Sequence, residues 1–135
     1  MTLEHVAIWT DRIETLREFY IKHFGAVANG KYVNEVKGFQ SYFLRFASGA
    51  RLEIMSRPDI PASQNDHLRQ FRGIIHLAFG ADTMREVDEK AEELKAAGYP
   101  ILSGPRRTGD GYYEFETLDP DNNRLEVTAV YPGNE

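Results

Sequence analysis

The sequence predicts an α+β fold built from two tandem βαβββ units, and three repeated features carry this prediction. Arg51-Leu52-Glu53-Ile54 and Arg124-Leu125-Glu126-Val127 are near-copies that alternate like strands after turn residues, with their glutamates 73 residues apart (126 − 53). A strand histidine opens each half, and His5 and His76 lie 71 residues apart (76 − 5). An amphipathic helix pattern follows each histidine. The same order at nearly constant spacing indicates an internal duplication.

The first half reads as strand, helix and three strands. Residues 2–10 alternate between apolar and polar faces, which predicts a strand. Asp11 is the expected N-cap, with Glu14 as its capping-box partner, and Gly25 is expected to end the helix. The apolar stripe of this helix is Ile13, Leu16, Phe19, Tyr20 and Phe24. Three strands are predicted at about 31–36, 41–47 and 51–56.

The second half repeats this order after a segment rich in proline and polar residues, 57–73, in which we expect a helical turn near 67–71. Residues 73–79 predict a strand, and Asp82 and Gly98 bound a predicted helix. The remaining predicted elements are a short strand at 101–102, a Gly/Arg-rich loop at 104–111, a strand at 112–118, a turn at 119–123 and the strand that carries Glu126.

Length and composition predict a single domain over residues 1–135 that is long enough to bury a core. Within it we expect repeat unit one at about 3–56, a linker at 57–73 and repeat unit two at about 74–130. The hydrophobic share of 41% and the charged share of 27% are ordinary for a soluble globular protein.

The charge pattern argues against a nucleic-acid partner, because the net charge is −5 and no basic run offsets it. The chain has no cysteine, which excludes disulfides and thiolate metal sites and fits a reducing compartment. No apolar run approaches the roughly 20 residues that a membrane span needs, and the N-terminus lacks the order of a signal peptide. We therefore expect a soluble, cytoplasmic protein without a membrane partner.

Two histidines and two glutamates at equivalent strand positions form the donor set that a divalent metal ion requires. Neutral imidazole and carboxylate suit Zn²⁺, Ni²⁺, Co²⁺, Mn²⁺ or Fe²⁺, and four protein ligands leave positions open for substrate oxygens. The alternation places Glu53 and Glu126 on the sheet face opposite the core, where they would line a concave surface. The plainer reading is a pair of structural strand histidines with solvated glutamates that pair with Arg51 and Arg124.

Several of these features together resemble one family. They are the early strand residue His5, the helix of residues 11–25 with Phe19-Tyr20, and the turn Asp119-Pro120-Asp121-Asn122 ahead of Leu125-Glu126. The chain resembles, over almost its whole length, the vicinal oxygen chelate superfamily of glyoxalase, bleomycin-resistance and dioxygenase proteins, in particular its glyoxalase I-like members.

The resemblance implies a cupped mixed β-sheet with the helices on its outer face, commonly within a homodimer. It also implies one divalent metal ion in the cup. The metal ligands of the family map onto His5, Glu53, His76 and Glu126. The ligands could come from one chain or from two.

One position departs from the glyoxalase I-like pattern. Those members typically carry an arginine four residues after the first histidine, where it binds the carboxylate of glutathione, and this chain has Trp9 there. An indole cannot form the bidentate pair that a guanidinium forms with a carboxylate. Trp9 could stack on a substrate or pack in the sheet, and Arg106 and Arg107 could bind an anionic substrate or lie in a solvated loop.

The resemblance implies a metal-dependent lyase or isomerase, similar to lactoylglutathione lyase, that acts on a small substrate with vicinal oxygens. The metal ion would stabilise an enediolate, and Glu126 or Glu53 would act as the base that moves the proton. Dioxygenation or a fosfomycin-type thiol transfer on the same site is the first alternative. The second is a protein without catalytic activity that sequesters a flat aromatic drug.

Overall fold

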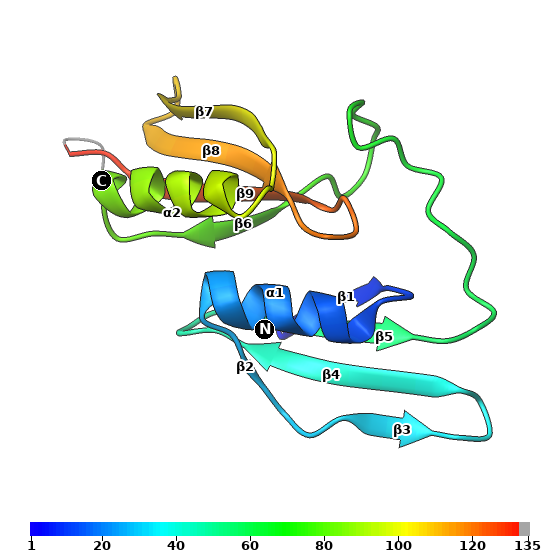
Figure 1. Cartoon of the computed structure of the whole chain (residues 1–135). Helices are drawn as coiled ribbons and strands as arrows, with labels where there is room; N and C mark the ends of the chain where they lie inside the picture. Colours follow the sequence, from blue (N-terminus) through cyan, green and yellow to red (C-terminus); the bar gives the residue numbers. More distant parts are fainter. Residues whose placement is uncertain (133–135) are drawn as a thin grey trace. The chain divides into compact units, whose positions relative to one another are not determined.

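A computed structural model describes residues 1–132, and the chain divides into two compact units. Unit 1 comprises Met1–Gln64, and unit 2 begins at Asn65. Each unit has one helix that packs on one face of a β-sheet (Figure 1), and each sheet contains parallel and antiparallel pairs. The predicted α+β class with a repeated unit is confirmed.

Unit 1 follows the predicted order with one additional short strand. Its sheet has the strand order β1-β5-β4-β2, and β3 also pairs with β4. β1 is parallel to β5, and β4 is antiparallel to β5. The elements are β1 (His5–Trp9), α1 (Ile13–Phe24), β2 (Val27–Ala28), β3 (Tyr32–Asn34), β4 (Phe39–Arg45) and β5 (Arg51–Ser56).

The core of unit 1 lies between α1 and the sheet. Leu52 and Ile54 of β5 are 2% and 0% exposed, and they face the helix residues Leu16 and Tyr20, which are fully buried. Side chains alternate along a strand, so Glu53 lies on the opposite face of the sheet. A shift of one residue would expose both apolar side chains, at a cost of about 1.5–3 kcal/mol each, and would bury the glutamate. The core therefore determines where the Glu53 carboxylate points.

The start of α1 differs from the prediction. Asp11 is not the N-cap; Arg12 occupies that position, and no side chain caps the helix. Glu14 is not available for a capping box, because its carboxylate accepts a hydrogen bond of 2.9 Å from the Tyr42 hydroxyl on β4. The helix end is as predicted, since Gly25 has a left-handed backbone conformation with φ of 66°.

Unit 2 repeats the arrangement with the strand order β6-β9-β8-β7. β6 is parallel to β9 and pairs Ala78 with Glu126, as β1 pairs Ala7 with Glu53. β8 is antiparallel to β9 and places Glu116 opposite Glu126. The elements are β6 (Leu77–Gly80), α2 (Met84–Ala96), β7 (Ile101–Arg107), β8 (Tyr112–Leu118) and β9 (Arg124–Val130).

The core of unit 2 reproduces the logic of unit 1. Leu125 and Val127 of β9 are 0% and 4% exposed, and they pack on the side of the sheet that carries α2, where Val87 and Leu94 are fully buried. The glutamate between the two β9 residues, Glu126, again lies on the other face. The predicted direction of both glutamates, away from the helices, agrees with the burial of their neighbours.

Two predictions at the ends of unit 2 elements are wrong. The N-cap of α2 is Thr83 rather than Asp82, because Thr83 and Glu86 form a complete capping box. The backbone N–H of Glu86 donates to the Thr83 hydroxyl at 3.1 Å, and the Glu86 carboxylate accepts from the Thr83 N–H at 3.3 Å. The predicted strand at 73–79 begins only at Leu77, so His76 immediately precedes β6.

The predicted Gly/Arg-rich loop at 104–111 is also wrong, because its first residues belong to the edge strand β7. Gly104 makes this possible. A Cβ at this position would lie 2.4 Å from the backbone oxygen of Glu114, and the residue has φ of +81°. Only glycine lets β7 approach β8 so closely in this conformation.

The segments that join the strands are largely as predicted. Residues 57–76 contain no helix or strand, and the expected helical turn near 67–71 is a single turn in which the Arg69 N–H donates to the Asp66 oxygen at 3.1 Å. The turn ahead of β9 is organised by buried Asp119, which accepts hydrogen bonds from the backbone N–H groups of Asp121 and Asn123, both at 2.9 Å.

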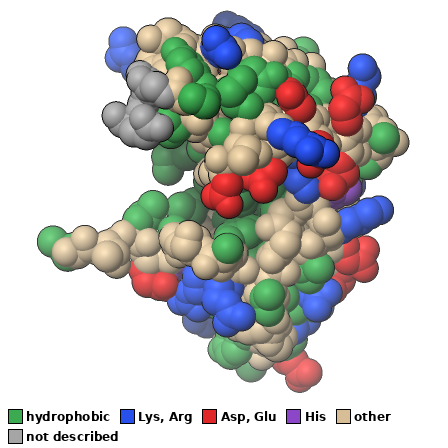
Figure 2. All heavy atoms as spheres, turned by 90° about the vertical axis from the view of Figure 1, so that its left-hand side faces the viewer, with side chains coloured by type: hydrophobic (Ala, Val, Ile, Leu, Met, Phe, Trp, Pro, Cys, Tyr) green, Lys and Arg blue, Asp and Glu red, His purple; other side chains and the backbone are tan. Residues whose placement is uncertain are grey.

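No helix within residues 1–132 combines the length and the apolar character that crossing a membrane requires. On the face shown in Figure 2, lysine and arginine side chains lie among aspartate and glutamate side chains rather than in a field of one sign. The surface chemistry of this face therefore gives no charge-based preference for a polyanion.

Candidate metal-binding residues

His5 and Glu53 lie together on the open face of the unit 1 sheet. His5 is on β1 and Glu53 on the adjacent strand β5, and the histidine Nε2 is 3.7 Å from the glutamate Oε1. The Glu53 side chain is 16% exposed and the His5 side chain 40% exposed. An imidazole nitrogen and a carboxylate oxygen therefore face each other at the position that the repeat predicts.

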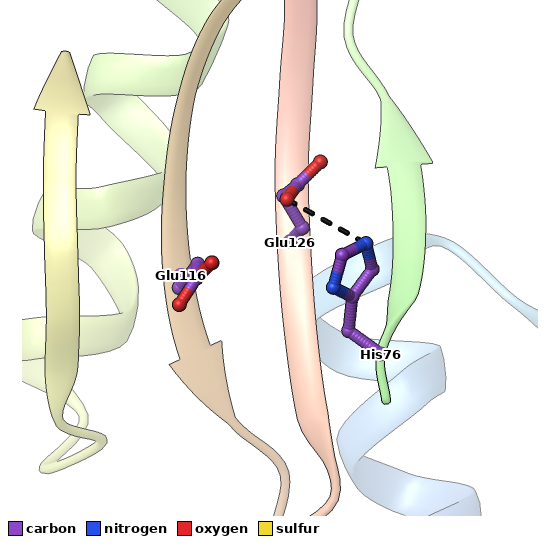
Figure 3. A group of neighbouring side chains, drawn as sticks. All are labelled: His76, Glu116 and Glu126. Carbon is purple, nitrogen blue, oxygen red and sulfur yellow. Dashed lines mark ion pairs between the residues drawn. The ribbon is translucent and has the colours of Figure 1, made fainter. Parts of the chain in front are cut away.

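His76 and Glu126 form the matching pair in unit 2, and a third ligand-type residue joins them. The His76 Nε2 is 3.6 Å from the Glu126 Oε2. Figure 3 shows these two side chains with Glu116, which projects from β8 on the same face of the sheet. One ligand atom from each of the three lies within 4.8 Å of the others. The equivalent position in unit 1 is Phe43, which pairs with Glu53 in the same register.

The two arginines of the repeated strands do not pair with the repeated glutamates. The Arg51 guanidinium forms an ion pair with Glu4, and Arg124 forms one with Glu116 at 2.7 Å. The alternative in which Arg51 and Arg124 pair with Glu53 and Glu126 is therefore not the arrangement observed. The carboxylates of Glu53 and Glu126 instead have a histidine as their ion-pair partner.

Arg124 is the more enclosed of the two arginines, with 10% of its side chain exposed. Besides Glu116, it donates to the backbone oxygen of His67 at 2.8 Å. Its Nε lies buried without a hydrogen-bond partner. His67 thus contributes its backbone oxygen to this contact. His23, on α1, is buried.

Glu114 is a further carboxylate on this face of unit 2. Burial is the largest cause that raises the pKa of Glu114, the hydrogen bond to Glu126 and the negative charge of that residue act in the same direction, and the resulting pKa is about 7. Arg106, opposite Glu114 in the strand register, lowers the pKa. At neutral pH the Glu114 carboxyl is therefore about half protonated and can donate to the Glu126 carboxylate.

Trp9 lies on the open face of unit 1, four residues along β1 from His5. Its side chain is 40% exposed, and its ring meets Phe39 edge-on with centroids 6.1 Å apart. The Arg57 guanidinium lies over the Trp9 ring at 5.3 Å, and Tyr32 continues the aromatic strip at 6.0 Å from Phe39. This strip offers π surfaces and a cation within the same unit as His5 and Glu53.

Arg106 and Arg107 are separated by the alternation of β7. Arg106 shares the face of Glu114, whereas Arg107 lies over the ring of Tyr131 at 5.2 Å. The Arg106 Nε also donates to the Ser103 hydroxyl at 3.4 Å. Of the two arginines, Arg106 is the one whose charge acts on Glu114, where it lowers the pKa.

The donors of each pair suit a divalent cation of the first transition series. Two ligands at about 2.1 Å from a common ion are about 3.0 Å apart at a right angle and about 3.4 Å apart at the tetrahedral angle. The observed N–O separations of 3.7 and 3.6 Å need only small side-chain movements to reach these values. Neutral imidazole with carboxylate is also the donor set that such ions prefer.

Sequence reasoning missed Glu4, Glu114 and Glu116. The last two could have been found, because β8 and β9 form a hairpin around the predicted turn at 119–123, and counting back from it places residue 116 opposite Glu126. Glu114 then follows on the same face by alternation. Glu4 gives no such signal, since only the contact of its side chain with the next residue and with β5 reveals it.

Comparison with known proteins agrees with the fold. Residues 2–127 match the model of the Glyoxalase/Bleomycin resistance protein/Dioxygenase superfamily. The chain is 26% identical over 136 residues to the uncharacterized protein YqjT of Bacillus subtilis, with 94% of this chain and 98% of YqjT covered.

Two solved structures show the same fold. The trypanothione-dependent glyoxalase I of Leishmania major has a TM-score of 0.76 and 18% identity, covering 96% of this chain and 86% of that one. The fosfomycin resistance protein FosX of Listeria monocytogenes, solved with Mn(II) and sulfate, has a TM-score of 0.73 and 21% identity, covering 98% and 94%. The chain belongs to the glyoxalase/bleomycin resistance/dioxygenase superfamily.

Proposed function

We propose that the protein is a metal-dependent, glyoxalase-like lyase or isomerase acting on a small substrate with two neighbouring oxygens. The observation that carries the proposal is the repeated pair: in each unit an imidazole nitrogen faces a carboxylate oxygen, at 3.7 Å and 3.6 Å, on the open face of the sheet. Membership in the superfamily, and the Mn(II) in the FosX structure, support a divalent ion as cofactor.

We propose that His5, Glu53, His76 and Glu126 are the residues that would hold the divalent ion, in a protein that is a homodimer. A divalent ion held there supplies Lewis-acid stabilisation of negative charge on the substrate oxygens. The protein residues position the substrate and move the proton. Zn²⁺, Ni²⁺, Co²⁺, Mn²⁺ and Fe²⁺ all suit this donor set.

Glu126 is our first choice for the base, with Glu53 as the second. The Glu126 carboxylate is 14% exposed and shares a hydrogen bond with Glu114, so an abstracted proton would have a neighbouring carboxyl group to pass to. Glu53 has no second carboxylate opposite it, because the matching position in unit 1 is Phe43. The proton would return from the same carboxylate to the neighbouring carbon, which isomerises the substrate. If the substrate is the hemithioacetal of a thiol and a 2-oxo aldehyde, the overall reaction counted from the free thiol and aldehyde is that of a lyase.

The substrate contacts follow from the same open faces. We propose that Trp9 contacts the part of the substrate that does not bind the metal, since its exposed ring lies four residues from His5 on one strand face. Arg106 would contact an anionic group of a substrate, because it is the arginine that lies beside Glu114. Arg107, engaged with Tyr131 on the other side of β7, is the weaker candidate.

The first experiment is elemental analysis of protein purified without added metal, followed by titration with Mn²⁺, Co²⁺, Ni²⁺ and Zn²⁺. We expect one ion per site, affinity lowered at least tenfold in Glu126→Gln, and unchanged affinity in Glu92→Gln, which alters an exposed glutamate on α2. Absence of any stoichiometric divalent ion, or full affinity in Glu126→Gln, would contradict the proposal.

Catalysis is tested without knowing the natural substrate. Hydroxy-ketones and the hemithioacetals of 2-oxo aldehydes with several thiols are incubated in D₂O, and exchange of the carbon-bound proton is followed by NMR. We expect exchange with the metal-loaded protein and a loss of at least a hundredfold in Glu126→Gln. Oxygen uptake with catechols under Fe²⁺ loading, or conjugation of fosfomycin to a thiol, would instead identify the alternative chemistries of the superfamily.

A second candidate function is sequestration of a flat aromatic compound, favoured by the strip of Trp9, Phe39 and Tyr32 in unit 1. Binding of an aromatic drug such as bleomycin would quench the fluorescence of the single tryptophan. Affinity that persists after EDTA treatment, together with no proton exchange in D₂O, would favour this function over catalysis.

A further inference from the structure

The His5 side chain makes contacts with Glu4 and Phe43 that are not repeated around its counterpart His76 within residues 1–132. Its Nδ1 lies 3.1 Å from the Glu4 Oε1, while its Nε2 is the nitrogen that faces Glu53. The ring also meets Phe43 edge-on, with centroids 5.4 Å apart at 81°. The imidazole is therefore held from one nitrogen and from its edge, and the other nitrogen is presented to the proposed ligand partner.

The Glu4 carboxylate is itself held in place by Arg51. The Arg51 Nε donates to the Glu4 Oε2 at 3.0 Å, and its Nη2 donates to the Oε1. The backbone N–H of Arg51 also donates to the Glu4 carbonyl at 2.9 Å. The guanidinium then lies over the Phe43 ring at 4.2 Å, so Glu4, His5, Phe43 and Arg51 form a closed ring of contacts.

This arrangement decides which nitrogen of His5 carries the proton. An ionised carboxylate can only accept hydrogen bonds, so Nδ1 must be the donor toward Glu4. In the neutral imidazole the proton is then on Nδ1, and Nε2 keeps the lone pair that a metal ion needs. A carboxylate behind a ligating histidine is a common way to fix its tautomer and ring orientation.

Unit 2 has the same arginine but uses it differently. The position equivalent to Glu4 is Ile75, directly before His76, and it has no acceptor oxygen on its side chain. Arg124, equivalent to Arg51, pairs with Glu116 at the position equivalent to Phe43. The only ion pair of His76 within residues 1–132 is the one with Glu126. The repeated arginine therefore supports the histidine in unit 1 and a carboxylate in unit 2.

We propose that Glu4, clamped by Arg51, is a positioning residue that fixes His5 as an Nε2 ligand, and that no carboxylate within residues 1–132 supports His76 in this way. The role of His5 as a ligand rests on the proposed function, whereas the tautomer of His5 does not. The proposal predicts that the two histidines differ in the metal-free protein: His5 is held as the Nδ1–H tautomer, and His76 is free to exchange between tautomers.

The test is ¹⁵N NMR of the imidazole nitrogens in metal-free protein at a pH where the histidines are neutral. The chain has four histidines, and the loss of one signal set in His5→Gln assigns His5. We expect Nδ1–H for His5 in the wild type and a shift toward Nε2–H in Glu4→Ala. Glu4→Gln keeps an acceptor oxygen and should restore much of the Nδ1–H form, and Glu18→Gln on α1 should change nothing.

Metal affinity is the second readout, because a misoriented ligand lowers it. We expect Glu4→Ala to raise the Kd for Zn²⁺ or Mn²⁺ about tenfold, with a smaller effect in Arg51→Met, and no effect in Glu18→Gln. Glu4 precedes β1 and its side chain is 59% exposed, so Glu4→Ala should keep the melting temperature of the wild type.

The outcomes separate the two proposals. A wild-type His5 in the Nε2–H form, or a Nδ1–H form that survives Glu4→Ala, would overturn the positioning role even if metal binds. Nδ1–H in the wild type that is lost in Glu4→Ala would support that role even in a protein that binds no metal, in which case the proposed function is the part that fails.

Discussion

The carboxyl pair of Glu114 and Glu126 gives the sharpest prediction about the open face of unit 2. The pKa of Glu114 lies at about 7 in the folded chain because the side chain is partly buried and hydrogen-bonded to a second carboxylate. An ordinary glutamate with a pKa of 4.5 is about 3% protonated at pH 6, whereas Glu114 should be about 90% protonated. Glu126→Gln removes the negative charge next to Glu114, so the pKa of Glu114 should fall toward the ordinary value. The part of the shift that burial causes should remain.

The same pKa has a consequence for stability. Because the folded state holds the Glu114 proton more tightly than the unfolded state, its contribution is fully present below about pH 4.5 and is lost as the pH rises through about 7. The full linkage value would be about 3 kcal/mol. Glu114 keeps part of its surface in water, and solvent screening reduces the expected loss to about 1–2 kcal/mol.

The assay is a ¹³C NMR titration of the side-chain carboxyl groups, with urea unfolding at pH 5 and pH 8 beside it. Between these pH values the wild type should lose about 1–2 kcal/mol of unfolding free energy relative to Glu114→Gln, which cannot titrate at this position. A Glu114 carboxyl that titrates near 4.5, or equal pH dependence in the two proteins, would refute the reasoning.

Two further predictions concern the framework that carries the site. Gly104→Ala should destabilise the chain by about 3 kcal/mol, because its Cβ would meet the Glu114 oxygen at 2.4 Å. The control Gly25→Ala, which has a positive φ but no atom within 4 Å of its Cβ, should cost only about 1 kcal/mol. Equal losses of unfolding free energy in urea would show that the structure relieves the contact at position 104. Leu125→Ala, at a fully buried position next to Glu126, should lower the free energy of unfolding by about 3 kcal/mol. The control Ile74→Ala, at a position that is 87% exposed, should change it by no more than about 0.5 kcal/mol. A small loss in Leu125→Ala would mean that β9 does not depend on this core for its register.

The repeat and the direction of its glutamates could be predicted from the sequence because they follow from local rules. Alternation with a period of two sends Glu53 away from Leu52 and Ile54 whatever the partner strand is. Helix stripes and turn residues are similarly local, and both helices were placed within one or two residues. The errors fell at element ends: Asp11 and Asp82 were plausible caps, but Glu14 was used by Tyr42, and Thr83 had the better partner in Glu86.

The edge strand β7 shows a second limit of local rules. Glycine, proline and arginine at 104–107 are typical of a loop, and the sequence offered no reason to extend the strand through them. Pairing with β8 overrides that preference, because Gly104 tolerates the close approach to Glu114 that the pairing requires. As a result Arg106 and Arg107 lie on opposite faces of a strand instead of together in a flexible loop.

By itself, then, the sequence determined the duplicated order of strand, helix and strands, the equivalent positions of the two histidines and two glutamates, and the face on which each glutamate lies. Only the tertiary structure decided the partners of the charged side chains. Arg51 selects Glu4 and Arg124 selects Glu116, although the two arginines occupy the same place in the repeat. The physical reason is that an ion pair depends on strand register and on the reach of a side chain across neighbouring strands, and neither quantity is a property of spacing along the chain.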